Sequence, residues 1–200
     1  MTKFSISAED YNEILRLGKI FAGKTGSREV LKNAHFKSFC GPDCPELTVE
    51  ASDGYIYGMY RVQFISYEDD LCDFLFPPAS IKADKGTVVE FTVGDGELTV
   101  ILIADGHKMG KSAPLDEYSR YPDFTRALPA GPDDGDLKTF NAGKIATCLK
   151  WFKASENVAS WRASPDCVYF ANRKRAAACV SVKMRERLNE VLLDFTHRRR

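Results

Sequence analysis

The first pattern of apolar and polar positions along the chain predicts a helix near the N-terminus. Ser7 is a favourable N-cap residue, and apolar side chains recur at helical spacing from Tyr11 to Phe21. Charged and polar side chains occupy the other side of this stretch, and Gly23 follows it as a residue type that commonly ends helices. We therefore expect a helix over residues 8–22, with its apolar face packed on a sheet.

Alternating and aromatic-rich segments after this helix predict antiparallel strands. Asp-Gly pairs separate several of these segments, for example at Asp53-Gly54 and Asp105-Gly106. Such a pair between two alternating segments is a strong hairpin signal. The expected strands cover residues 33–39, 47–51, 55–62, 73–77, 88–93, 97–103, 108–112, 158–163, 167–172 and 176–184.

Helical segments recur between the groups of strands. Residues 78–85 predict a short helix, and Asn141 is placed to cap another whose apolar stripe includes Cys148 and Phe152. The pattern therefore predicts an α+β fold of about three repeats, each a helix packed on a small antiparallel sheet.

A spacer rich in Gly, Pro and Asp, residues 130–138, predicts a domain boundary. It separates an expected domain of two repeats, residues 1–129, from an expected half domain, residues 139–200. Beyond Met184, apolar residues at helical spacing predict a short C-terminal amphipathic helix, and the sequence ends in the basic run 198–200.

Composition narrows the class of protein. Lys plus Arg and Asp plus Glu each number 28, and this zero net charge is unlike a dedicated DNA-binding protein, although local positive stripes still attract phosphates. No apolar run approaches the roughly 20 residues that span a bilayer. The first residues also lack the apolar core of a signal peptide. We therefore expect a cytoplasmic protein.

The six cysteines are expected to be free thiols in that compartment. Cys40 and Cys44 form the one close pair, with His35 nearby, but a zinc site needs four ligands at suitable spacing. Two interpretations stay open for this pair: part of a metal site, or a turn between two strands whose geometry Gly and Pro set.

Enzyme motifs are absent from the sequence. It contains neither a phosphate-binding glycine loop nor a His-Glu-x-x-His zinc motif, and His107 has no nucleophile-elbow partner. Asp69, Asp70 and Asp73 fit either a metal cluster or a solvated acidic loop. We expect a protein without a cofactor or catalytic activity.

The linker 120–129 carries the most informative motif. Its Tyr121-Pro122-Asp123-Phe124-Thr125-Arg126-Ala127-Leu128-Pro129 resembles the aromatic-Pro-Asp-aromatic-x-Arg-x-Leu/Ile-Pro linker of the bacterial sliding-clamp family, the DNA polymerase III beta subunits. The strand and turn 47–55 are similar to the Thr-Asp-Gly-His-Arg turn of that family, with Tyr55 in place of His. The segment 180–185 resembles its C-terminal strand, with Lys183 in place of Pro.

This resemblance implies a function in DNA replication. Family members are processivity factors that encircle DNA and hold partner peptides in a hydrophobic pocket. They contain three full domains, whereas this chain resembles one whole domain and half of another. The implied partners are a DNA polymerase or other replication proteins, double-stranded DNA without sequence preference, and other copies of the chain. A head-to-tail tetramer would supply about twelve repeats to a ring. Two alternatives stay open: a non-ring interaction module that regulates replication proteins, and an unrelated α+β enzyme.

The resemblance also implies a peptide pocket. Apolar side chains with an arginine at the rim suit an anchor residue of a short peptide. The alternative is that the residues of the last strand are simply sheet core. The implied lining consists of Ser52, Gly54, Tyr55, Ile56, Pro122, Arg126, Ala127, Val180, Val182 and Met184.

Contacts with DNA, if the ring forms, would come from helix faces turned toward its hole. Such contacts would reach phosphates and would be blind to sequence. The alternative is that these basic side chains are only solvated. The candidates are Arg16, Lys19, Lys82, Lys85, Lys144, Lys150 and Lys153.

Overall fold

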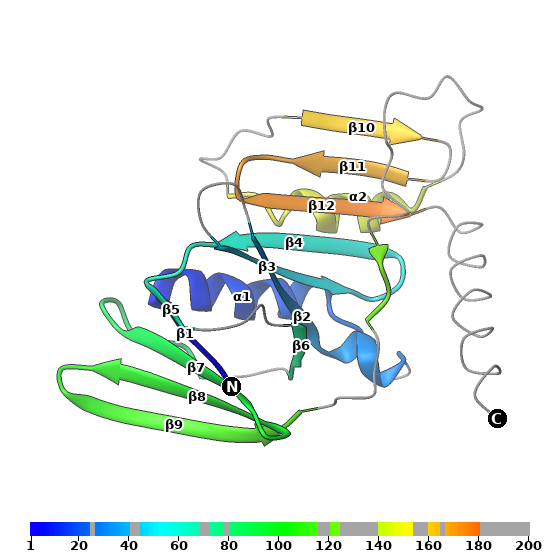
Figure 1. Cartoon of the computed structure of the whole chain (residues 1–200). Coiled ribbons are helices and arrows are strands. Elements are labelled where there is room, and N and C mark those ends of the chain that lie inside the picture. The colour runs from blue at the N-terminus through cyan, green and yellow to red at the C-terminus, as the bar shows by residue number, and fades with distance from the viewer. Residues whose placement is uncertain are drawn as a thin grey trace, which may run out of the picture.

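Two antiparallel sheets and two α-helices form the part of the chain that the computed structural model describes (Figure 1). Neither helix in this part is long and apolar enough to cross a membrane. The described residues are 1–24, 27–40, 45–68, 73–77, 81–115, 121–124, 140–153, 160–164 and 167–180.

Most predicted elements are present in the predicted order, whereas the strands over 2–7 and 66–68 and the 3-10 turn over 29–32 were not predicted. The helical elements are α1 (Ala8–Phe21), the 3-10 turn η1 (Glu29–Lys32) and α2 (Ala142–Leu149). The strands are β1 (Thr2–Ser7), β2 (Ala34–Cys40), β3 (Pro45–Ser52), β4 (Ile56–Val62), β5 (Ser66–Glu68), β6 (Asp73–Phe76), β7 (Val88–Gly94), β8 (Glu97–Ala104), β9 (His107–Pro114), β10 (Ser160–Ser164), β11 (Cys167–Ala171) and β12 (Arg175–Val180).

The predicted first helix is confirmed, together with its cap. The Ser7 hydroxyl accepts a hydrogen bond from the Asp10 backbone N–H at 3.0 Å, which satisfies one of the free donors at the start of α1. Tyr11, Ile14 and Leu17 are buried on one face of the helix. That face packs on the sheet, and each such side chain stabilises the fold by about 1.5–3 kcal/mol.

The first strand of each of the first two repeats pairs within the sheet of the other repeat. The five-stranded sheet has the order β5-β1-β7-β8-β9, so β1 lies beside β7 with Phe4 opposite Phe91. The seven-stranded sheet has the order β10-β11-β12-β4-β3-β2-β6, so β6 lies beside β2. This exchange joins the two repeats into one unit, where the sequence had predicted a separate sheet for each.

Aromatic side chains fill the space between the two sheets. Phe4 stacks on Phe91 with 4.9 Å between ring centroids, and Phe36 stacks on Phe74 at 4.8 Å. Phe36 also approaches Phe91 at 5.6 Å, which links the seven-stranded sheet to the five-stranded one. Offset aromatic pairs add about 0.5–1.5 kcal/mol beyond the area they bury.

The third repeat extends the seven-stranded sheet. β12 pairs with β4, and α2 packs on the face of the sheet that α1 covers, because Phe21 and Trp151 meet at 5.8 Å in one core. The sheet therefore continues from the first repeat into the third. The division at 130–138 stays a prediction, since that spacer lies outside the described residues, as does the expected C-terminal helix.

The helix predicted over residues 78–85 is wrong for the part that the structure describes, 81–85. The side chain of Asn12 donates to the Ala83 carbonyl at 2.7 Å and accepts from the Ala83 N–H at 3.0 Å. These bonds replace the intrahelical partners that a helix would give Ala83. Lys82 and Lys85 therefore lie on an irregular segment and not on a helix face.

Two glycines on facing elements give a test of this packing. A Cβ at Gly58 of β4 would lie 2.2 Å from the Phe21 ring, whereas a Cβ at Gly18 of α1 meets no atom within 4 Å. We expect Gly58→Ala to lower the free energy of unfolding by about 2–3 kcal/mol, because Phe21 is fully buried. Gly18→Ala should raise it by about 0.5–1 kcal/mol. Urea unfolding of both variants measures this difference, and equal midpoints would contradict the packing.

Candidate peptide-binding site

The turn between β3 and β4 is held by its own side chains. The Ser52 hydroxyl donates to the Ile56 carbonyl at 2.7 Å and accepts from the Gly54 N–H at 3.0 Å. The Asp53 carboxylate accepts from the Tyr55 and Ile56 N–H groups at 2.8 and 2.9 Å. Gly54 has φ +89°, a backbone conformation that favours glycine. These bonds hold the backbone of the turn, including that of Tyr55, in one conformation.

The N-terminal end of α2 contacts this turn. Asn141 caps α2 as predicted, accepting from the Lys144 N–H at 3.1 Å. The Lys144 ammonium forms an ion pair with Asp53 and lies 5.1 Å from the centre of the Tyr55 ring. This predicted DNA-contact residue thus supports the turn of the candidate site.

β12 lies directly beside the turn. The Val180 N–H donates to the Tyr55 carbonyl at 2.9 Å, which fixes the end of β12 against the start of β4. The Val180 side chain is buried with Tyr57, Phe124 and Cys167 on the sheet face opposite α1. We call this face the outer face. The Ile56 side chain points the other way, into the main core.

The described part of the 121–129 motif packs on the outer face. Phe124 is 4% exposed and lies 5.5 Å from the Tyr57 ring and 5.8 Å from the Tyr121 ring. Tyr121 stacks on His35 of β2 at 4.8 Å, and Pro122, the next residue, is buried. The two aromatic rings anchor this segment on the sheet.

Six residues of the predicted pocket belong to these three segments. The turn supplies Ser52, Gly54, Tyr55 and Ile56, the linker supplies Pro122, and β12 supplies Val180. The other four lie outside the described residues: Arg126, Ala127, Val182 and Met184.

Known proteins resemble this chain in structure. No protein-family model and no curated protein sequence matches the chain. The DNA polymerase III beta subunit of Pseudomonas aeruginosa is similar in structure, with a TM-score of 0.65 and 13% identity over 90% of this chain and 66% of that one. The Helicobacter pylori beta clamp bound to a DNA ligase peptide has a TM-score of 0.59 and 13% identity, over 90% and 65% of the two chains.

The Thermotoga maritima beta subunit gives a TM-score of 0.60 at 9% identity, over 91% of this chain and 65% of that one. The chain has the sliding-clamp fold. The predicted α+β class and the resemblance to this fold are confirmed, and the chain spans slightly less than two thirds of the length of these clamps.

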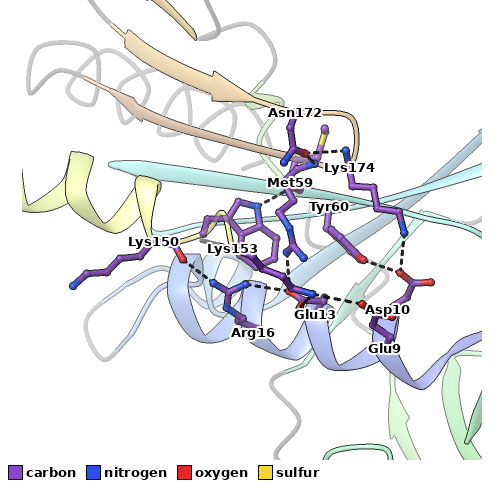
Figure 2. Close-up of polar contacts among 12 residues, drawn as sticks. Glu9, Asp10, Glu13, Arg16, Met59, Tyr60, Lys150, Lys153, Asn172 and Lys174 are labelled. Carbon is purple, nitrogen blue, oxygen red and sulfur yellow. Dashed lines mark hydrogen bonds and ion pairs between the residues drawn. The ribbon is translucent and has the colours of Figure 1, made fainter. Parts of the chain in front are cut away.

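In this clamp fold, the helix face predicted to contact DNA is occupied by ion pairs (Figure 2). Arg16 contacts the Glu13 carboxylate at 3.2 Å and donates to the Lys150 carbonyl at 2.6 Å. Lys153 lies 3.0 Å from Glu13 and 3.5 Å from Glu9. The carboxylates of α1 therefore offset part of the positive charge of Arg16 and Lys153.

The remaining candidates for DNA contact are spread over three segments. Lys19 lies on α1 and Lys150 directly after α2, and both are exposed. Lys82 and Lys85 are exposed on the irregular segment described above. Contact of these residues with DNA stays a prediction.

Sequence reasoning missed Arg175, which joins the third repeat to α1 of the clamp fold. Its side chain is 2% exposed and donates to Glu13 at 2.7 Å. The guanidinium lies 4.6 Å from the Trp151 ring centre and 5.0 Å from that of Tyr60. Charged residues are rarely buried, and Arg175 follows two other basic residues, so no sequence signal singles it out.

Glu13 is stabilised as a carboxylate by this arrangement. Burial by itself would raise the pKa of Glu13, but hydrogen bonds and charges from Arg175 and Lys153 outweigh that effect and lower the pKa to about 2. A lowered pKa in the folded state means that stability is present above the ordinary value of 4.5 and is lost as the pH falls toward 2.

We expect Glu13→Gln to lower the free energy of unfolding by about 2–3 kcal/mol at pH 7, because it leaves the buried Arg175 without its carboxylate. The difference from the wild type should shrink between about pH 4.5 and pH 2, where Glu13 of the wild type takes up its proton. Denaturant unfolding across this pH range is the measurement. Glu9→Gln, at an exposed position, is the control and should change little. A Glu13→Gln defect of constant size down to pH 2 would disprove the assignment.

Proposed function

We propose that this protein is a clamp-like DNA polymerase processivity factor or replication-partner binding protein that holds short partner peptides beside the β3–β4 turn. The supporting observation is the bond from the Val180 N–H to the Tyr55 carbonyl. It joins the third repeat to the turn, while Pro122 and its aromatic neighbours pack nearby on the outer face. Segments far apart in the sequence thus converge where the resemblance expects the pocket.

The similar structures support this choice of ligand. The Helicobacter pylori clamp was solved with a DNA ligase peptide, and a clamp from Bartonella birtlesii with griselimycin. Tyr55 supplies a partly exposed aromatic side chain on a rigid turn, the kind of residue on which the affinity for a peptide commonly depends. The proposal involves no catalytic step and no cofactor.

We expect a fluorescent clamp-binding peptide from a replicative DNA polymerase to bind saturably, and Tyr55→Ala to weaken that binding at least about tenfold. Val182→Asp, in the strand that the resemblance assigns to the pocket, should have the same effect. Fluorescence anisotropy measures both. Tyr67→Ala changes a tyrosine of similar exposure in the five-stranded sheet and should leave the affinity unchanged. Absence of binding by the wild type would remove the peptide-binding function.

A non-ring interaction module is the second candidate, because the carboxylates of α1 offset part of the positive charge of Arg16 and Lys153. A clamp that encircles DNA and a non-ring module should differ in their retention on circular DNA. A closed ring should stay on circular duplex DNA after a salt wash and slide off linear duplex, and light scattering should show an oligomer. A protein that is monomeric at high concentration and is washed equally from both DNA forms would favour the module.

A further inference from the structure

His35 lies at the centre of a polar cluster on the outer face, beneath the linker segment. The residue is 8% exposed. Its Nδ1 lies 2.7 Å from a Glu50 oxygen, and its Nε2 lies 2.6 Å from an Asp73 oxygen. A neutral imidazole carries one N–H, so it can donate to only one of these carboxylates. The geometry fits a doubly protonated ring that donates to both.

The groups around His35 come from every strand next to it. Glu50 belongs to β3 and also accepts a hydrogen bond from the Tyr57 hydroxyl of β4 at 2.8 Å. Asp73 belongs to β6, and its side chain is 70% exposed. Lys37, two residues along β2, is opposite Asp73 in the strand pairing and is exposed. Both carboxylates that contact His35 directly favour its cation.

Tyr121 covers the His35 ring. The two rings stack with their centroids 4.8 Å apart and their planes 28° apart, and the Tyr121 hydroxyl is buried. A cation against the face of a tyrosine ring gains electrostatic attraction that a neutral imidazole does not. Tyr121 in turn contacts Phe124, so the protonation of His35 bears on the anchoring of residues 121–124.

We propose that His35 is a positioning residue for the candidate site: its protonated ring holds Tyr121, and with it residues 121–124, on the outer face, and loss of that proton weakens peptide binding. This role rests on the peptide-binding function proposed above. The affinity for the partner peptide should therefore fall as the pH rises. Proton loss leaves one of the two carboxylates without its bond from His35, and the exposed Asp73 can turn to solvent more easily than the buried Glu50, which keeps the bond from Tyr57.

The direction of the pKa shift of His35 agrees with this geometry. Burial would lower the pKa of His35, but hydrogen bonds and charges from Glu50 and Asp73 outweigh it and raise the pKa above the ordinary 6.5. The contribution of the protonated ring is therefore present at low pH and is lost as the pH rises through the raised pKa.

Ring NMR signals of His35 and a fluorine signal of 3-fluorotyrosine at Tyr121, assigned with Tyr121→Phe, test the proposal without any peptide. Both signals should change with one shared midpoint in the wild type. Asp73→Asn removes the exposed carboxylate and should move that midpoint to lower pH. His35→Gln should abolish the change at Tyr121, whereas His107→Gln, on the exposed strand β9, should leave it intact.

Peptide anisotropy over the same pH range completes the test. We expect the affinity to fall roughly fivefold through the His35 midpoint, and this fall to shift with Asp73→Asn. A Tyr121 signal that ignores His35, or an affinity that stays constant through the His35 titration, overturns the proposal. A coupled Tyr121 signal without peptide binding at any pH would instead reject the peptide-binding function and retain the positioning of Tyr121 by His35.

Discussion

β12 pairs with β4 along its length, and this pairing determines the arrangement of the candidate site. It places Val180 beside the β3–β4 turn, brings α2 next to α1, and carries Arg175 to Glu13. Without it, the two sides of the proposed pocket would belong to separate units. The outer face and the helix face of the seven-stranded sheet therefore depend on the same strand register, in which a shift by one residue would exchange their side chains.

The Arg175–Glu13 pair disfavours shifted registers of β12 on β4. A buried ion pair is weak evidence for added stability, because taking two charges out of water costs several kcal/mol per ion. Removing one partner is far more costly than keeping both. The Arg175 guanidinium also contacts the Trp151 and Tyr60 rings, so it fits a site built from α1, β4 and the segment that follows α2. A slipped pairing would leave this charge buried and alone.

Local patterns predicted most elements, whereas contacts between distant segments escaped prediction. The helix at Ala8–Phe21 and its Ser7 cap follow from spacing that neighbouring residues determine. The Asp-Gly hairpins follow from turn chemistry, and Asp105 has the positive φ that such turns require. β1 was missed because its partner, β7, lies far along the chain. The expected helix over 78–85 failed because the amide of Asn12 bonds to Ala83.

In the candidate site, too, local segments could be predicted from the sequence and contacts between distant segments could not. The motif at residues 121–129 and the Asp53-Gly54 turn indicated the right segments, since each is a short pattern with its own geometry. The burial of His35 and Arg175 could not be inferred, because a charged side chain becomes buried only when partners from other strands satisfy it. Ile56 illustrates the limit within one strand: its neighbour Tyr57 faces the outer side, whereas the Ile56 side chain enters the main core.

The exchange of first strands between the first two repeats delays the folding of the chain during its synthesis. As the chain leaves the ribosome, β1 emerges well before its long partner β7, which begins at Val88. Until then β1 can meet only the three residues of β5. Pairing between such distant segments closes a long loop and is slow to form. The first repeat therefore completes the pairing of β1 only after β7, in the second repeat, has been synthesised.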